Sequence, residues 1–256
     1  NRSLASQRIM AEMVTCFIIA SYMLPAWSVS PYFYPHGDRG TGKTQLLTVI
    51  TEIGYLGQFT TAGGTFAALR DLKDYGATLG IDDAENVSDT KRIDPDKRAL
   101  FLAGNRRNSS IPLKEQVGNN SWQIRHVNTF GFCVFTAIRQ ADSVLGSRSI
   151  VIPLIRTADR SKGNIDPADH TAWPHDRRQL VDDLWALGLA NITRMPGYEQ
   201  QVGELARLVG RNLEPWRAIM AVALWLDDSG VNGLWARIEQ LSVDYQRERP
   251  NLEYGD

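Results

Sequence analysis

The sequence predicts an α/β fold in which a parallel sheet flanked by helices is followed by a region made only of helices. Three observations support this prediction. Strand-like and helix-like segments alternate over residues 1–156, a glycine-rich loop separates the first predicted strand from an amphipathic segment, and every apolar pattern after residue 177 has helical spacing. Residues 157–176 are polar and rich in proline, aspartate and histidine, so we expect them to connect the two parts.

The composition is that of an ordinary globular domain. Hydrophobic residues make up 43% and charged residues 22% of the 256 residues, enough for one large α/β domain with a smaller appended unit. The formal net charge of -1 provides no overall attraction to nucleic acid or to an anionic membrane, so a nucleic-acid contact would require a local basic patch. Cys16 and Cys133 lie in separate apolar runs, which predicts buried, reduced thiols.

Residues 13–27 form an apolar run that loosely resembles a signal peptide. The run is shorter than the roughly 20 residues that span a bilayer, and no small-residue cleavage pattern follows it. We therefore expect a buried helix, no membrane association and a cytoplasmic protein. Because the sequence begins at Asn1 and stops at Asp256, we also expect a domain excised from a longer protein.

The elements of residues 1–156 are predicted from periodicity and from end signals. A helix over residues 3–22 has a broad apolar stripe and should pack on more than one side. Gly54 is predicted to end the helix that follows the glycine-rich loop. Thr65 should cap the next helix, and Asp94, which precedes a proline, should cap a third. The predicted strands cover residues 32–35, 58–61, 77–81, 110–115, 122–127, 131–136 and 149–155.

Residues 177–256 are predicted to form a helical lid. Apolar side chains recur at helical spacing within residues 180–187, 202–208, 215–226 and 231–245. Strands alternating with helices, followed by helices alone, indicate a parallel sheet core with this lid attached.

Residues 37–44 fit the Walker A pattern G-x-x-x-x-G-K-[ST] at every fixed position. Small residues there allow backbone N–H groups to surround a β-phosphate, next to the positive end of the helix that begins there. Lys43 would reach the β- and γ-phosphate oxygens, and the Thr44 hydroxyl would coordinate Mg²⁺. Because a strand precedes the loop and an amphipathic helix follows it, we predict binding of ATP with Mg²⁺. The residues predicted to contact the nucleotide are Gly37, Asp38, Arg39, Gly40, Thr41, Gly42, Lys43, Thr44 and Gln45.

The predicted strand at residues 77–81 ends in acidic residues. Asp82 would hold Mg²⁺ through water, and Asp83 would polarise the attacking water. ATPases of this kind usually carry glutamate at the second position, and aspartate is one methylene shorter. Glu85 could take over this role only if the loop bends back. The sequence therefore predicts hydrolysis and leaves open which carboxylate is the base.

The order of these motifs resembles that of the AAA+ ATPases. A Walker A loop, an acid-ended strand, a hairpin and a further strand are followed by Leu-Gly-Ser-Arg-Ser-Ile at residues 145–150. The pattern is most similar to the helicase-like ATPases that accompany primases in phages, plasmids and integrative elements. The resemblance spans most of the chain and implies an ATPase core over residues 1–156 with a lid behind it.

The resemblance implies roles for residues outside the phosphate loop. Arg148 precedes an apolar strand, where AAA+ proteins keep an arginine finger that reaches the γ-phosphate of the neighbouring subunit. Thr136 ends the strand at residues 131–136 and resembles sensor 1, which orients the lytic water. Arg211, with Arg217 as its rival, resembles sensor 2 of minichromosome maintenance ATPases. An ordinary surface arginine and a strand-end threonine are the structural alternatives.

The predicted hairpin, at about residues 109–128, lies where minichromosome maintenance and superfamily 3 helicases insert a hairpin that points into a central pore. Basic groups would bind phosphates there and an aromatic ring would stack on bases. The alternative is a solvated hairpin whose charges only maintain solubility. The residues predicted to contact DNA are Arg106, Arg107, Lys114, Trp122, Arg125 and His126.

The sequence therefore favours an ATP-driven replicative helicase domain of a mobile element or virus. The resemblance implies that the protein forms a ring, with six subunits expected. We also expect it to translocate on single-stranded DNA and to work with a primase domain or protein. One alternative is an AAA+ protein that remodels or loads other proteins, such as a helicase loader or a transposition regulator. Another is an ATP-binding scaffold with weak hydrolysis, suggested by Asp83. A small-molecule kinase shares the Walker A loop, but nothing in the sequence resembles its acceptor-site lid.

Overall fold

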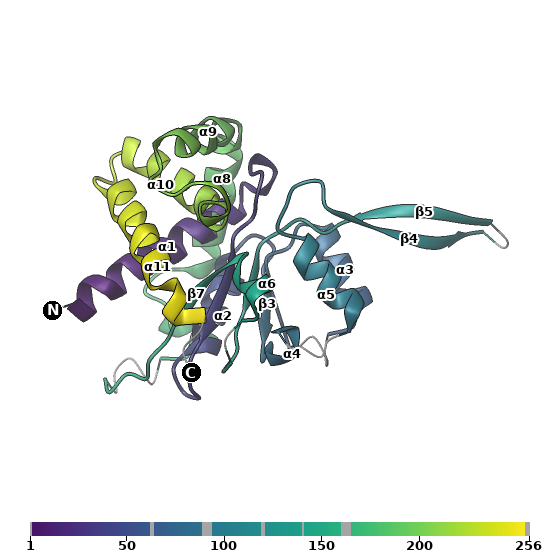
Figure 1. The fold of residues 1–256 in the computed structure, drawn as a ribbon, viewed down its shortest axis with the longest axis horizontal. Coiled ribbons are helices and arrows are strands. Elements are labelled where there is room, and N and C mark those ends of the chain that lie inside the picture. Colours follow the sequence, from purple (N-terminus) through teal and green to yellow (C-terminus); the bar gives the residue numbers. More distant parts are fainter. Residues whose placement is uncertain are drawn as a thin grey trace.

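The centre of the molecule is a parallel sheet. The computed structural model describes residues 2–61, 64–88, 94–118, 121–139, 141–159 and 165–253. Within these residues the sheet has five strands, in the order β2-β3-β6-β1-β7 (Figure 1). Their bounds are β1 (Tyr32–His36), β2 (Gln58–Thr61), β3 (Leu79–Asp82), β6 (Cys133–Phe135) and β7 (Ser149–Pro153). The α/β fold with a parallel core is thus confirmed.

The inner strands are apolar because helices cover both faces of the sheet. The inner strands β1, β3 and β6 and the edge strand β7 are almost entirely buried, whereas the other edge strand, β2, is largely exposed. Continuous apolar runs are typical of parallel strands that are covered on both sides. On one face the ring of Phe17 stacks on Phe33 at 4.0 Å and meets Phe132 edge-on at 5.0 Å.

The predicted helix signals are confirmed in the core. The Thr65 hydroxyl accepts from the Ala68 N–H at 3.3 Å, and an Asp94 carboxylate oxygen accepts from the Asp96 N–H at 2.8 Å. Gly54 ends its helix, although with an extended backbone rather than a left-handed one. The core helices are α2 (Lys43–Ile53), α3 (Phe66–Asp74), α4 (Glu85–Ser88), α5 (Pro95–Ala103) and α6 (Ser143–Gly146).

The C-terminal part is helical, as predicted. Its α-helices are α8 (Arg177–Asn191), α9 (Met195–Leu205), α10 (Arg217–Asp228) and α11 (Leu234–Glu253). Short 3-10 helices lie at Leu24–Ala26, His170–Ala172, Ile192–Arg194, Gly210–Asn212 and Glu214–Trp216. α10 is the centre of this part, with its residues 218–225 all buried.

The N-terminal helix α1 (Arg2–Ser21) joins the sheet to the C-terminal helices (Figure 1). It packs on the sheet through Phe17, as described above, and it also contacts α10 and α11. The Glu12 carboxylate receives two hydrogen bonds from the Arg237 guanidinium, at 2.8 and 3.0 Å. The prediction that α1 packs on more than one side is confirmed.

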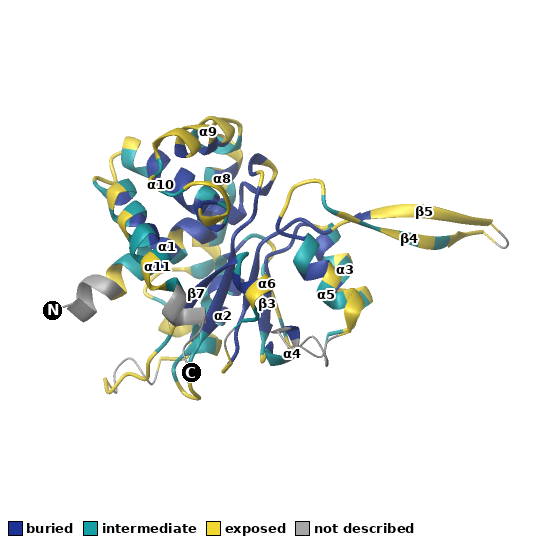
Figure 2. Cartoon of the chain, in the orientation of Figure 1, coloured by how far each residue is buried: buried dark blue, intermediate teal, exposed yellow. Residues whose placement is uncertain are grey.

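A long β-hairpin projects from the body of the molecule (Figures 1 and 2). It pairs β4 (Ser110–Val117) with β5 (Ser121–Asn128) in antiparallel register. The predicted hairpin is confirmed, and both strands run slightly beyond their predicted ends. The last two residues of the predicted turn, 119 and 120, lie outside the described residues. Val127 is buried at the base, whereas Trp122 and Ile124 are 58% and 69% exposed.

Two further expectations concern the apolar run and the cysteines. None of the helices in the described part of the chain is both long and apolar enough to cross a membrane. Cys16 and Cys133 are buried and free, as predicted. Burial raises the pKa of the Cys16 thiol to about 12, so this side chain packs as a neutral apolar group.

Candidate nucleotide-binding site

The loop between β1 and α2 has the backbone shape of a phosphate cradle. Gly40 and Gly42 adopt left-handed φ angles of 77° and 88°, which residues with a Cβ rarely adopt. Position 37 has no room for a side chain, because a Cβ there would lie 2.3 Å from the Leu154 carbonyl oxygen. The loop leads directly into α2, whose first N–H groups and positive end attract anions. The glycine positions of the Walker A pattern are thus explained by this fold.

The Lys43 ammonium lies over the loop. Its Nζ donates to the carbonyl oxygens of Gly37 and Asp38, at 2.6 and 2.8 Å. The Thr41 hydroxyl donates to the same Asp38 oxygen at 2.9 Å and closes the turn. Burial lowers the pKa of His36, the last residue of β1, and the positive charge of Lys43 lowers it further. His36 is thus favoured in its neutral form, and the Lys43 ammonium provides the positive charge where a phosphate would bind.

Three oxygen-bearing side chains meet at the carboxyl ends of β3 and β6 and the start of α2. The Thr44 hydroxyl lies 3.1 and 3.3 Å from the two Asp82 carboxylate oxygens. The Thr136 hydroxyl, fully buried, donates to the same carboxylate. Register explains the meeting, because Ile81 of β3 pairs with Phe135 of β6. Hydroxyl and carboxylate oxygens are the ligands that Mg²⁺ prefers, so Thr44 and Asp82 suit that ion.

The chain after Asp82 bends back toward the loop. Asp83 adopts a left-handed φ of 52°, a conformation that aspartate tolerates better than most residues. The bend brings Glu85 round, and its Oε1 accepts from the Ile138 N–H at 2.9 Å. Both Asp83 and Glu85 line the cavity at the phosphate loop. The cavity therefore contains both of the carboxylates that the sequence offers as the base.

The cavity has a volume of about 900 Å³ and is formed by the strand-end loops. The residues that line it are Arg39, Gly40, Thr41, Gly42, Lys43, Thr44, Gln45, Asp82, Asp83, Glu85, Ile138, Ile155 and Thr157. Sequence reasoning missed Ile138, Ile155 and Thr157, although each follows a strand that ends at this edge of the sheet. It also missed Ile165, whose carbonyl oxygen accepts from the Gln45 amide at 2.8 Å.

Comparisons with known proteins test the fold rather than the activity. No protein-family model and no curated protein matches this sequence. Among solved structures the chain is similar to "SCCmec type IV Cch - active helicase", with a TM-score of 0.57 and 13% identity over 94% of this chain and 48% of that one. This chain thus spans about half the length of that helicase. Together with the phosphate loop and the strand order, this match decides the fold. The chain has an α/β P-loop fold with a parallel sheet and a helical C-terminal part.

Two further structures are similar at lower scores. AMPPCP-bound DnaA from Aquifex aeolicus has a TM-score of 0.30 at 13% identity, covering 91% of this chain and 86% of that one. NtrX from Brucella abortus in complex with ATP has a TM-score of 0.33 at 14% identity, covering 97% of this chain and 68% of that one.

In this fold Arg148 lies at the amino ends of the strands, opposite the phosphate loop at their carboxyl ends. Ser149 pairs with Tyr32 at the amino end of β1, whereas Gly37 follows the carboxyl end of that strand. At about 3.3 Å per residue the two levels are roughly 16 Å apart. The Arg148 guanidinium donates to the Val144 carbonyl oxygen at 2.8 Å and to the Ser147 hydroxyl at 3.3 Å. The structure does not bring Arg148 to the cavity of its own chain.

The two sensor 2 candidates also lie away from the cavity. Arg211 is exposed in the 3-10 helix at Gly210–Asn212. Arg217 opens α10, and its Nη2 lies 3.5 Å from the Glu199 carbonyl oxygen. The Glu199 carboxylate in turn accepts from the Ser28 hydroxyl at 2.6 Å, ahead of the amino end of β1. Neither arginine is among the described residues that line the nucleotide cavity.

The pairing of β4 with β5 determines which of the residues predicted to contact DNA share a face of the hairpin. Directly opposed residues share a face, and the pairs Lys114 with Ile124 and Gln116 with Trp122 place lysine and tryptophan on one face. The Lys114 Nζ lies 5.5 Å from the centre of the Trp122 ring, and among the described residues Lys114 has no ion pair. His126 lies on the same face because it alternates with Ile124. We call Lys114, Trp122, Ile124 and His126 the hairpin face.

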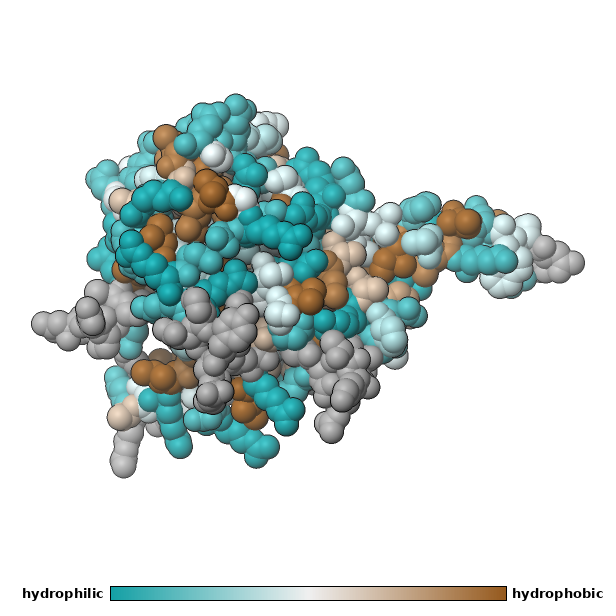
Figure 3. Space-filling view, viewed as in Figure 1, coloured by the Kyte–Doolittle hydropathy of each residue, from teal (hydrophilic) through white to brown (hydrophobic). Residues whose placement is uncertain are grey.

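The other predicted DNA contacts are engaged within the chain. Arg125 lies on the opposite face and forms ion pairs with Asp74 of α3 and with Glu115. Arg106 forms an ion pair with Glu214 at 2.7 Å. Arg107 donates to the carbonyl oxygens of Trp27 and Pro25, at 2.7 and 2.6 Å. These three arginines hold the base of the hairpin to the body, whereas Figure 3 shows the hairpin itself as a mixed hydrophobic and hydrophilic surface.

Proposed function

We propose that this protein is an ATP-hydrolysing AAA+ motor that moves along single-stranded DNA, as the helicase domain of a replicating mobile element or virus. The observation that carries the proposal is the meeting of Lys43, Thr44 and Asp82 at the phosphate loop. The projecting hairpin supports the choice of DNA. The structural neighbour with the higher score is described as an active helicase, which is consistent with the proposal.

The nucleotide site suggests how hydrolysis would proceed. Lys43 would exchange the loop carbonyls for the β- and γ-phosphate oxygens of ATP, since a phosphate is a stronger acceptor for an ammonium group. Thr44 and Asp82 would hold Mg²⁺, which neutralises charge on the phosphates when bound. Thr136 fixes the Asp82 carboxylate by its hydrogen bond. A carboxylate then takes a proton from water as the water attacks the γ-phosphorus and the bond to the β-phosphate oxygen breaks.

Substitution of each carboxylate by its amide distinguishes the roles of Asp83 and Glu85. We propose Asp83 as the base, because within the described residues its carboxylate has no hydrogen-bond partner, whereas Glu85 is held by the Ile138 N–H. Asp83→Asn is expected to lower kcat for ATP about 100-fold, the usual range for a lost general base, and Glu85→Gln to lower it less. Steady-state ATPase assays with binding of a fluorescent ATP analogue check both. A greater loss in Glu85→Gln would transfer the role to Glu85.

The position of Arg148 favours assembly into a ring. Since Arg148 lies at the opposite edge from the phosphate loop of its own chain, it can meet a γ-phosphate only across a subunit boundary. A ring, for which we propose six subunits, gives each site such a neighbour. A primase domain or protein would be a partner of the assembled ring.

The hairpin face has the chemistry that single-stranded DNA requires. Trp122 is exposed and offers a ring for base stacking, and Lys114 beside it offers a charge for the phosphates. Neither contact reads sequence, which suits a motor that must pass every base. Arg106, Arg107 and Arg125 would position the hairpin rather than contact the strand.

The two faces of the hairpin provide a matched test. Trp122→Ala is expected to weaken binding of single-stranded DNA by about 1–3 kcal/mol. Lys114→Gln is expected to reduce the slope of log K against log salt concentration by about 0.7 for one lost phosphate contact. Fluorescence anisotropy at several salt concentrations measures both. Gln123→Ala on the opposite face is the control, and equal losses in Gln123→Ala and Trp122→Ala would contradict the assignment of this face.

One experiment tests the proposed function as a whole. The ATPase rate is measured with and without single-stranded DNA on protein whose oligomeric state is determined in the same buffer. We expect hydrolysis that DNA stimulates and that depends on assembly. Hydrolysis that DNA leaves unchanged would instead support a motor that remodels proteins. Nucleotide binding without turnover would support a scaffold.

A further inference from the structure

A partly buried ion pair lies beside the short helix that precedes Arg148. Arg98 of α5 meets the carboxylate of Asp142 through two hydrogen bonds, Nη2 to Oδ1 at 3.1 Å and Nη1 to Oδ2 at 3.2 Å. The side chains are only 16% and 19% exposed. Burial of the carboxyl alone would raise the pKa of Asp142, but Arg98 and the N–H groups of Leu145 and Val144 outweigh it and lower the pKa. The aspartate is thus charged and its position is fixed from two sides.

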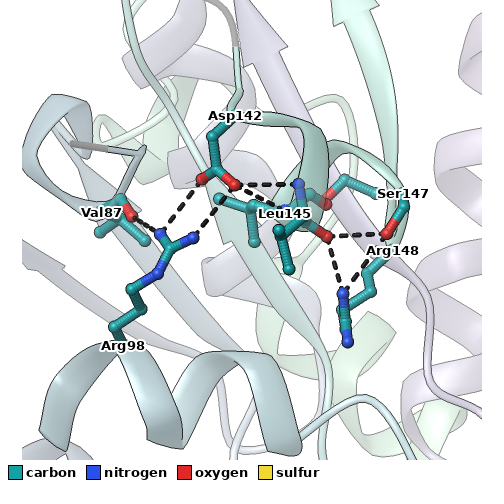
Figure 4. A network of polar contacts seen from close by, with 8 residues as sticks. Val87, Arg98, Asp142, Leu145, Ser147 and Arg148 are labelled. Atoms are coloured by element: carbon teal, nitrogen blue, oxygen red, sulfur yellow. Dashed lines mark hydrogen bonds and ion pairs between the residues drawn. The ribbon is translucent and has the colours of Figure 1, made fainter. Parts of the chain in front are cut away.

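The same carboxylate organises the helix before Arg148. Asp142 is the N-cap of α6, and its Oδ1 accepts from the N–H groups of Val144 and Leu145 at 2.9 and 3.2 Å. Arg148 lies at the other end of this single turn, with its guanidinium on the Val144 carbonyl oxygen and its own N–H on the Leu145 carbonyl oxygen at 3.1 Å. Figure 4 shows Asp142 between Arg98 and this turn, with Arg148 beyond it.

The pair is also tied to the chain that follows Asp82. Arg98 Nη1 donates to the carbonyl oxygen of Val87 at 3.0 Å, and Val87 belongs to α4, which Glu85 opens at the nucleotide cavity. A four-residue helix has little stability of its own, so α6 depends on these tertiary contacts. The orientation of Arg148 therefore depends on Arg98 and Asp142.

We propose that Arg98 and Asp142 are positioning residues for Arg148, holding its guanidinium at the angle from which it reaches the nucleotide of the adjacent subunit. This inference rests on the proposed function, because it assigns the pair to the catalytic partner of a neighbouring site. A bidentate guanidinium–carboxylate pair fixes angle as well as distance, and an error of about 1 Å in a catalytic group can reduce a rate about 100-fold.

Asp142→Asn separates the two roles of the aspartate, because asparagine still caps a helix but carries no charge for Arg98. We expect kcat for ATP to fall at least about tenfold while KM changes less than about twofold. Arg98→Lys, which keeps the charge and loses the planar fork, should show the same pattern. Asp176→Asn, at the N-cap of α8, is the matched control and should retain the wild-type rate. Thermal unfolding confirms that each variant is folded.

A mixing experiment shows whether the defect lies in a subunit's own nucleotide site or in the arginine that it offers to the neighbouring site. Asp142→Asn subunits keep their own nucleotide site, and Lys43→Ala subunits keep their Arg148, so mixed rings should hydrolyse ATP faster than rings of either variant alone. Absence of this rescue in both Asp142→Asn and Arg98→Lys, or an unchanged kcat in both, would overturn the proposal. If Arg148→Ala itself retained full activity, the proposed trans mechanism would fail instead, and the two failures are thus distinguishable.

Discussion

Replacing Arg148 with alanine is expected to lower kcat for ATP about 1000-fold, the lower end of the range for arginines that act on a transferring phosphoryl group. ATP affinity should remain within about twofold, because the side chain lies at the sheet edge opposite the phosphate loop of its own chain. The measurement is single-turnover hydrolysis beside equilibrium binding of a fluorescent ATP analogue. Arg148→Lys should lose most of the rate as well, since an ammonium group cannot make a bidentate contact.

Two controls make the Arg148 experiment specific. Arg178→Ala removes an exposed arginine from α8 and should leave kcat unchanged. Mixing Arg148→Ala with Lys43→Ala subunits should restore hydrolysis at the interfaces where an intact nucleotide site meets an intact arginine. Failure to restore activity in rings that demonstrably contain both variants would contradict action across the subunit boundary.

Replacing Lys43 with alanine is expected to reduce kcat/KM for ATP by at least about 100-fold, in the range seen when one preorganised donor to a developing oxyanion is removed. The loss should appear in nucleotide binding as well as in turnover, because Lys43 faces both the β- and γ-phosphate positions. Isothermal titration with a non-hydrolysable ATP analogue and steady-state hydrolysis measure the two parts.

The Lys43 variant should remain folded. Among the described residues its ammonium donates hydrogen bonds only to loop carbonyl oxygens. The melting temperature of the variant should therefore be close to that of the wild type. Lys97→Ala on α5 is the matched control. Wild-type hydrolysis in Lys43→Ala would contradict the assignment of the phosphate loop.

The geometry of the phosphate loop could be predicted from the sequence because its signals are local. The glycines, Lys43 and Thr44 are contiguous, and Asp82 directly ends a strand, so pattern and strand order together place them at one edge of the sheet. Asp94 and Thr65 cap helices that begin at the very next residue. The alternation of side chains along β5 also separates Arg125 from Trp122 and His126, a distinction that the period of a strand makes available without a structure.

Long-range pairings could not be predicted in the same way. The ion pairs of Arg125 with Asp74, of Arg106 with Glu214 and of Arg98 with Asp142 join residues that lie on different elements. An exposed arginine and a paired one look alike in a sequence, so the intrachain partners of the arginines at the hairpin base could not be predicted. The sensor 2 candidates depended on a resemblance alone, and their location is set by how the C-terminal helices pack.

Asp74 anchors the root of the hairpin to α3. Its carboxylate binds both the Arg125 side chain and the Asn128 N–H, so the root of β5 is held to the end of α3. The helix α3 follows β2 in the chain, and β2 pairs with β3 as far as Asp82. Each arm has eight residues and extends about 26 Å at roughly 3.3 Å per residue, so a tilt of about 10° at the root would displace the tip by about 5 Å. A small change in the orientation of α3 would thus move the exposed end of the hairpin by several ångströms.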